Sequence, residues 1–169
     1  MSSMQLYTEP IVGAPNFTIA ELCKSSTADK MGIDNKPSKL AVQNLEYLAK
    51  KVLQPIRDHF GVPIKVTSGY RSPALNKAVG GSETSFHSHG MAADIQFTSA
   101  EKVYTLFDIF TYVYDMLEYT ELIAEELPNG WIHVAIERGR EDERQLKYKM
   151  AGGIVRRSDY DSIKHLFSM

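Results

Sequence analysis

The sequence contains one cysteine, Cys23, in 169 residues. A single cysteine excludes an intramolecular disulfide framework and any zinc site built from several thiolates. Cys23 lies in the segment FTIAELCKSS at a helical spacing that indicates a buried apolar position, and no histidine is near it in the sequence. We therefore interpret it as a small core residue rather than as a nucleophile.

Long hydrophobic runs and a strong charge of one sign are also missing. The longest apolar stretches are far too short to cross a bilayer, and the N-terminal segment lacks the basic and apolar regions of a signal peptide. A net charge of −2 gives no reason to expect nucleic acid as a partner. We therefore expect a monomer that is made in the cytoplasm, without membrane insertion and without bound nucleic acid.

The composition suits one folded unit, because 43% of the residues are hydrophobic and no repeat or low-complexity segment is present. We predict a single domain over residues 1–169. Its first 16 residues are expected to be irregular, since they contain Pro10, Gly13 and Pro15. The polar tail over residues 152–169 has no clear pattern and is left unassigned.

Helical patterns dominate the first part of the chain. Apolar residues recur at helical spacing over residues 37–61, with Pro55 expected to kink this helix and Gly61 to end it. The segment Thr18–Glu21 has the capping-box pattern of a short helix, and a second short helix ends at Gly32. Another capping box, Thr98–Glu101, predicts a second long helix over residues 99–119.

Strand patterns cluster later. The expected strands are residues 63–70, 92–97, 121–125, 131–136 and 144–151, and a short helix and a glycine-rich loop fill residues 71–82. Early helices and late strands indicate an α+β fold. We expect a mostly antiparallel sheet with the helices packed on one side.

Four residues have the chemistry of zinc ligands: His87, His89, Asp94 and His133. A catalytic zinc ion commonly has three nitrogen or oxygen ligands and one open position for water. The spacing differs from the helical HExxH arrangement, which excludes a thermolysin-like site. Taken alone, these residues fit a metal site and ordinary loop histidines equally well.

A family resemblance separates these alternatives. The segment SGYRSPALNKAVGGSETSFHSHGMAADI resembles the signature of bacterial and phage zinc peptidases, which include D-alanyl-D-alanine carboxypeptidases and L-alanoyl-D-glutamate endopeptidases. The matching positions are Ser68, Gly69, Tyr70, Arg71 and Ser72, then Ser85, His87, Gly90, Ala92 and Asp94, then Trp131 and His133. The similarity extends from Phe17 to about Lys149, its opening segment is similar to a prophage variant, and it implies a fold related to the Hedgehog signalling domain.

The resemblance also implies roles. His87, Asp94 and His133 are expected to bind Zn²⁺, with His89 exposed or behind the ligands. Some members carry the catalytic acid three residues before the last histidine, where this chain has Gly130. Prophage-type relatives carry a glutamate at the end of the preceding strand, which corresponds to Glu125. Strand alternation places Glu125 and Ile123 on one face, and Glu126 remains the alternative base.

Three further residues are expected to contact substrate: Arg71, Ser85 and Trp131. A guanidinium group suits a carboxylate or carbonyl of the substrate, although Arg71 could also serve only to organise its loop. The resemblance implies a zinc peptidase that cleaves the peptide stem of peptidoglycan and serves as a phage or prophage cell-wall lytic enzyme. The alternative is a non-catalytic, zinc-containing module that binds wall fragments or a protein.

Overall fold

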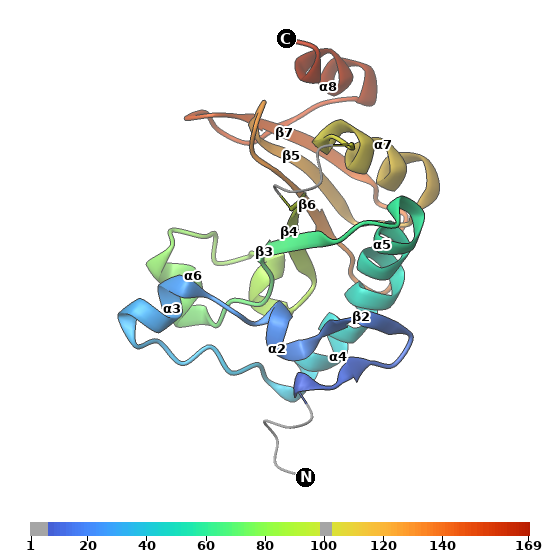
Figure 1. The fold of residues 1–169 in the computed structure, drawn as a ribbon. Helices are drawn as coiled ribbons and strands as arrows, with labels where there is room; N and C mark the ends of the chain where they lie inside the picture. The colour runs from blue at the N-terminus through green and yellow to red at the C-terminus, as the bar shows by residue number, and fades with distance from the viewer. Residues whose placement is uncertain (1–6, 99–102) are drawn as a thin grey trace.

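The computed structural model describes residues 7–98 and 103–169 (Figure 1). Its main sheet has six strands: β3 (Ile64–Ser68), β4 (Ala92–Phe97), β5 (Glu121–Leu127), β6 (Trp131–Ala135), β7 (Gln145–Met150) and β8 (Arg156–Arg157). Their order across the sheet is β3-β4-β6-β5-β7-β8. Every neighbouring pair is antiparallel except β5 and β7. The predicted α+β class with a mostly antiparallel sheet is confirmed.

The parallel pairing of β5 and β7 places β7 on the side of β5 that β6 does not occupy. The chain leaves β6, returns through residues 136–144 and enters β7 in the same direction as β5. Ile123 consequently pairs with His133 on one side and with Lys147 on the other. Because side chains alternate along a strand, these positions lie on one face of the sheet.

The helix predicted for residues 37–61 forms in three parts: α4 (Lys39–Leu48), the π-helical η1 (Ala49–Leu53) and α5 (Gln54–Phe60). Ser38 begins it, because its Oγ accepts a hydrogen bond from the Ala41 amide. The Gln54 amide donates to the Ala49 carbonyl, five residues earlier. The wider turn directly precedes Pro55, which has no amide hydrogen and clashes with a regular α-helical turn.

The expectation of an irregular N-terminus is wrong for residues 10–16. β1 (Pro10–Ile11) and β2 (Ala14–Thr18) form a small hairpin, and Gly13 turns it with a φ of 84°. Ile11 and Phe17 bury their side chains and thereby attach the hairpin to the core. Two short helices follow, α2 (Ile19–Leu22) and α3 (Ser26–Met31), and Thr18 caps the first as predicted.

Cys23 ends α2 and is half-buried against the core. Burial raises the pKa of its thiol to about 12. The thiol therefore stays protonated at neutral pH, which agrees with the interpretation of Cys23 as a packing residue.

The second long helix is shorter than predicted. It is α7 (Leu106–Met116), and Thr105 begins it in a capping box with Asp108. The predicted box at Thr98–Glu101 falls mainly on residues 99–102, outside the described residues. Residues 117–120 are not helical, because the chain there turns into β5.

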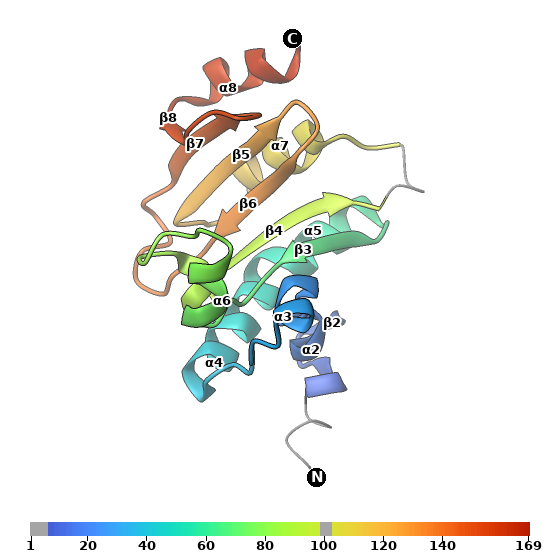
Figure 2. The same ribbon diagram turned by 90° about the vertical axis from the view of Figure 1, so that its left-hand side faces the viewer.

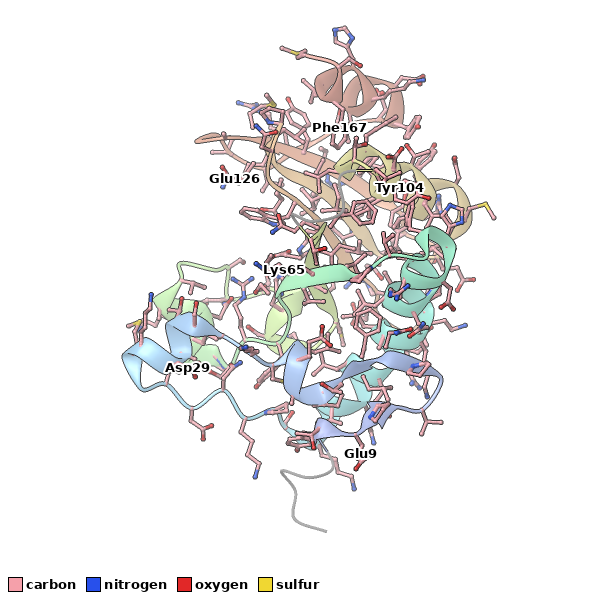
Figure 3. All side chains as sticks on the ribbon, in the orientation of Figure 1. Glu9, Asp29, Lys65, Tyr104, Glu126 and Phe167 are labelled. Atoms are coloured by element: carbon pink, nitrogen blue, oxygen red, sulfur yellow. The ribbon has the colours of Figure 1, made fainter. Side chains whose placement is uncertain are left out.

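The tail that the sequence left unassigned contains α8 (Tyr160–Phe167). Asp159 caps this helix by accepting a hydrogen bond from the Ser162 amide at 2.8 Å. The Tyr160 ring stacks on Tyr114 of α7 at 4.4 Å, and Phe167 lies on the side of α8 that faces α7 (Figure 3). The C-terminal segment is thus part of the folded domain.

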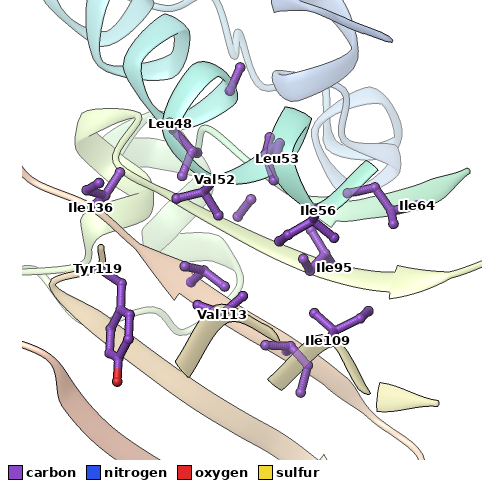
Figure 4. Close-up of a cluster of buried hydrophobic side chains, with 14 of the residues drawn as sticks. Leu48, Val52, Leu53, Ile56, Ile64, Ile95, Ile109, Val113, Tyr119 and Ile136 are labelled. Carbon is purple, nitrogen blue, oxygen red and sulfur yellow. The ribbon is translucent and has the colours of Figure 1, made fainter. Parts of the chain in front are cut away.

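The core lies between the sheet and the longer helices. α5 and α7 lie behind the sheet in Figure 2, whereas the segment of α6 (Pro73–Ala78) lies in front of it. Figure 4 shows the side chains that fill the helix-covered face, contributed by η1, α5, α7 and the strands. The predicted packing of the longer helices on one side is confirmed, and the opposite face is left for polar residues.

Candidate metal centre

Three predicted ligands meet on the front face of the sheet. His87 lies in the 3-10 helix η2 (Phe86–His89), Asp94 in β4 and His133 in β6. Asp94 Oδ1 lies 3.2 Å from His87 Nε2 and 3.0 Å from His133 Nδ1. One ligand atom from each residue lies within 4.8 Å of the others, so the group is compact enough to surround one ion.

Asp94 and His133 meet because they are directly paired across β4 and β6. His87 needs a turn to reach them. Ser85 begins that turn, since its Oγ accepts a hydrogen bond from the His87 amide, and Gly90 ends it in the left-handed region with a φ of 73°. A Cβ at Gly90 would lie 2.5 Å from the Ala41 carbonyl oxygen, so glycine also permits the close approach of η2 to α4.

The imidazole of His87 is oriented by the backbone. Its Nδ1 lies 2.7 Å from the Gly69 carbonyl oxygen, which can only accept a hydrogen bond. Nδ1 therefore carries the proton, and the lone pair of Nε2 points toward Asp94. Such a carbonyl contact on the remote nitrogen is the usual way in which proteins orient a metal-binding histidine.

The charge of the group is that of a cation site. Burial opposes the charged form of Asp94, but the nearby His87 and His133 outweigh it and hold the pKa of the carboxyl group well below its usual range. Asp94 is therefore a buried anion between two imidazoles. Two nitrogen donors and one carboxylate oxygen fit the ligand preference of a catalytic zinc ion.

The two candidate glutamates lie in different surroundings. Glu125 Oε1 is 3.9 Å from His133 Nδ1, and burial together with the negative charge of Asp94 raises the pKa of Glu125. Glu126 forms an ion pair with Lys149, which lowers its pKa, and it lies near the end of β5 (Figure 3). Its φ of 51° breaks the strand alternation. The geometry brings Glu125, and not Glu126, to the three candidate ligands.

A cavity of about 970 Å³ opens beside this group, and the three candidate substrate residues all line it. Within the described residues, no group accepts a hydrogen bond from the buried Nε of Arg71. Ser85 supports η2, as described above. Trp131 lies opposite Glu125 in the β5–β6 pair and forms part of the cavity wall. His89 is exposed at this cavity and stands outside the three-residue group.

Sequence reasoning missed Glu121. This residue is only 8% exposed, and its Oε1 lies 2.9 Å from His133 Nε2, at an angle outside that of a well-formed hydrogen bond. Its other oxygen pairs with Lys147. The available signal was the alternation of Glu121, Ile123 and Glu125, which places all three on the face of the candidate ligands.

A second hollow, of about 840 Å³, lies beyond Trp131 toward the β5–β6 turn. It shares Asp94 and Trp131 with the first. Its remaining lining comes from β3, β4, the turn and the end of β7: Thr67, Ser68, Gln96, Glu126, Pro128, Asn129, Gly130 and Ala151. The candidate ligands therefore have open space on two sides.

None of the helices in residues 7–98 and 103–169 has the length and apolar character needed to span a bilayer.

A search of proteins with curated functions finds no significant match. The family model described as Peptidase M15 matches residues 15–135, a segment that contains all three candidate ligands and Glu125. Because the match covers more than half of the chain, the protein belongs to the peptidase M15 family.

Proposed function

We propose that the protein is a zinc peptidase that hydrolyses the peptide stem of bacterial peptidoglycan. The observation that supports it best is the group of His87, Asp94 and His133 beside the carboxylate of Glu125, in a chain of the peptidase M15 family. Three protein ligands, an adjacent acid and an open cavity are the parts that metal-assisted hydrolysis of an amide requires.

His87 Nε2, Asp94 Oδ1 and His133 Nδ1 would hold the ion. When bound there, zinc supplies Lewis acidity, which polarises a carbonyl group and lowers the pKa of water toward about 7. Glu125 then accepts the proton of the attacking water and gives it to the amine that leaves. Its raised pKa suits this double role, because a group that must take up and release a proton works best near the working pH.

Arg71 would hold the substrate. Burial lowers the pKa of its guanidinium group, while the charges of Asp94 and Glu125 raise it again, so the group stays cationic next to the reacting centre. A guanidinium fork can donate two parallel hydrogen bonds to a carboxylate or a carbonyl of the stem. Trp131 would form the wall between the two hollows. Ser85 would act through His87, because its Oγ accepts a hydrogen bond from the His87 amide.

Between the two activities of such enzymes, we propose endopeptidase cleavage. A carboxypeptidase needs room for only one residue beyond the scissile bond. Here the second hollow continues past Trp131 as far as the β5–β6 turn. This space would accept a peptide that continues on both sides of the bond that is cut.

We further propose that the protein serves as a cell-wall lytic enzyme of a phage or prophage. The support for this role is the similarity of its opening segment, from Phe17 to Ser38, to the prophage variant of the family. Peptidoglycan outside the cytoplasm would then be reached with the help of a membrane-permeabilising partner or from a virion.

The test is digestion of purified peptidoglycan, with mass spectrometry of the released fragments. We expect internal stem cleavage by the zinc-loaded protein, none after chelation, and recovery when zinc is added back. Glu125→Gln should abolish cleavage but retain zinc, whereas Glu126→Gln should retain both. Release of single terminal D-alanine would contradict the endopeptidase proposal alone. A zinc-loaded protein that binds wall fragments but cleaves none would establish the binding module instead.

A further inference from the structure

Glu121 and Lys147 form a part-buried ion pair directly behind His133, on the side away from Asp94. We propose that this pair, the Glu121–Lys147 brace, positions His133 as a zinc ligand through Nδ1 and thereby sets the zinc affinity of the site. The inference rests on the proposed zinc function. It assigns a role to two residues that belong to neither the ligand group nor the peptidase motif.

The brace continues a line of polar contacts that joins four strands. Lys147 Nζ of β7 lies 2.5 Å from Glu121 Oε2 of β5, and Glu121 Oε1 lies 2.9 Å from His133 Nε2 of β6. His133 Nδ1 then lies 3.0 Å from Asp94 Oδ1 of β4. The two nitrogens of one imidazole thus face two carboxylates, one among the candidate ligands and one in the brace.

Burial of the Glu121 carboxylate opposes folding. Glu121 is 8% exposed, and a buried carboxylate is destabilising unless a cation or hydrogen-bond donors compensate it. Position 121 lies on the same face of β5 as Ile123. An apolar side chain at position 121 would carry no such cost. Lys147, itself mostly buried, provides the compensating charge and fixes which oxygen faces His133.

Zinc binding would fix the tautomer of His133, because each of its ring nitrogens faces a carboxylate oxygen. A neutral imidazole carries one N–H, and a carboxylate can only accept a hydrogen bond. An ion held through Nδ1 needs the lone pair on that nitrogen, so the proton would lie on Nε2, where Glu121 can accept it. His87 shows the opposite arrangement, because the Gly69 carbonyl accepts from its Nδ1. Each histidine therefore has an acceptor beside the nitrogen that would not bind the ion, one from the backbone and one from a side chain.

A second ion pair in the same sheet offers a matched control. Glu126 and Lys149 also join β5 to β7, but neither contacts His87, Asp94 or His133 at a described distance. Loss of the Glu126 charge removes a glutamate–lysine pair between the same two strands without changing the partner of a ligand. Effects specific to the brace can thus be separated from effects of any β5–β7 ion pair.

The experiment is titration of the full-length protein with zinc in competition with a chelating dye, with zinc-free unfolding midpoints measured in parallel. We expect Glu121→Gln to weaken zinc binding about 10–100-fold, the usual effect of losing a partner of a ligating histidine. Lys147→Met should weaken it several-fold, since Glu121 remains but loses its fixed orientation. Glu126→Gln should change the zinc affinity less than about twofold.

The outcomes separate the brace from its alternatives. If Glu121→Gln lowers the zinc-free unfolding midpoint while its zinc affinity equals that of the wild type, the pair is only structural and the proposal is overturned. If Glu121→Gln does not fold, Lys147→Met decides by the same comparison. A wild-type protein that binds no zinc would overturn the proposed function as well, whereas unchanged affinity in both variants would overturn the brace alone.

Discussion

Gly130 faces the carbonyl oxygen of Glu125 so closely that a Cβ at position 130 would lie 2.0 Å from that oxygen. The turn between β5 and β6 is tight here, and Glu126 contributes a further contact from its own backbone. Position 130 lies three residues before His133, where the resemblance given in the sequence analysis would place the acid of some family members. In this chain no side chain fits there, and the carboxylate that we propose as the base, Glu125, lies on the neighbouring strand β5.

This contact predicts that Gly130→Ala is destabilising. The clashing atoms are two backbone oxygens and the Cβ of Glu126, so they cannot rotate away as the end of a side chain would. We expect a loss of about 1–3 kcal/mol in the free energy of unfolding, as for other overpacked sites. Urea denaturation monitored by circular dichroism measures it. A variant with an unchanged midpoint would show that the turn can open to accept a side chain at position 130.

The separate roles of the neighbouring histidines predict a second result. His87→Ala should lose zinc, because it removes a member of the ligand group, whereas His89→Ala should retain one zinc per chain because its ring is exposed. At zinc concentrations about 100-fold above the dissociation constant, zinc should raise the melting temperature of the wild type and of His89→Ala by about 5–10 °C. Elemental analysis and thermal scans test both statements. Zinc retained by His87→Ala would refute the ligand assignment.

The sequence predicts the candidate ligands better than it predicts the residues around them. The family resemblance, and not the spacing alone, singles out His87, Asp94 and His133, and strand alternation then favours Glu125 over Glu126. The same alternation places Glu121 on that face, but its pairing with Lys147 in β7 could not be found in this way. That strand lies parallel to β5 after a long return of the chain, and no local pattern reveals which strands become neighbours.

The dependence on contacts between distant segments also explains why some predicted helices and strands differ from those in the structure. The start of α7 was predicted at one capping pattern, whereas the helix begins at another, Thr105, because two such patterns stand a few residues apart. The hairpin over residues 10–18 and the helix α8 are short, and each is stabilised mainly by a few buried side chains such as Ile11 and Ile163. Tertiary packing rather than local propensity decides such segments.

Arg71 provides a third prediction, which concerns substrate affinity. Arg71→Lys keeps the charge but removes the fork and the Nε donor, so we expect about a 10–100-fold loss in kcat/KM, mainly through KM. Arg140→Lys is the matched control, because Arg140 lines the same cavity but is already paired with Glu137 and Glu143. Steady-state kinetics on a defined stem peptide measures both. An equal loss in the two variants would indicate a general effect of replacing an arginine at the cavity.

The last prediction concerns the loop that carries part of the cavity wall. The Tyr47 hydroxyl of α4 donates a 2.6 Å hydrogen bond to Glu141, and the Arg138 guanidinium lies over the Tyr47 ring at 4.4 Å. The hydrogen bond to Glu141, burial and nearby negative charge raise the pKa of Tyr47 to about 12. The raised pKa means that folding favours the protonated phenol, so its contribution is complete below the ordinary tyrosine pKa of about 10 and is lost between about pH 10 and pH 12.

Tyr47→Phe removes this hydrogen bond and keeps the ring over which Arg138 lies. We expect the wild type to unfold at a higher urea concentration than Tyr47→Phe at pH 8, and the gap to close as the pH rises from 10 to 12. Chemical denaturation across that range is the measurement, and Tyr148→Phe serves as a comparison for general alkaline effects. A gap that stays constant up to pH 12 would show that the difference between the two proteins does not come from the phenol proton. The loop would then be held by Arg138 and its other contacts rather than by the bond to Glu141.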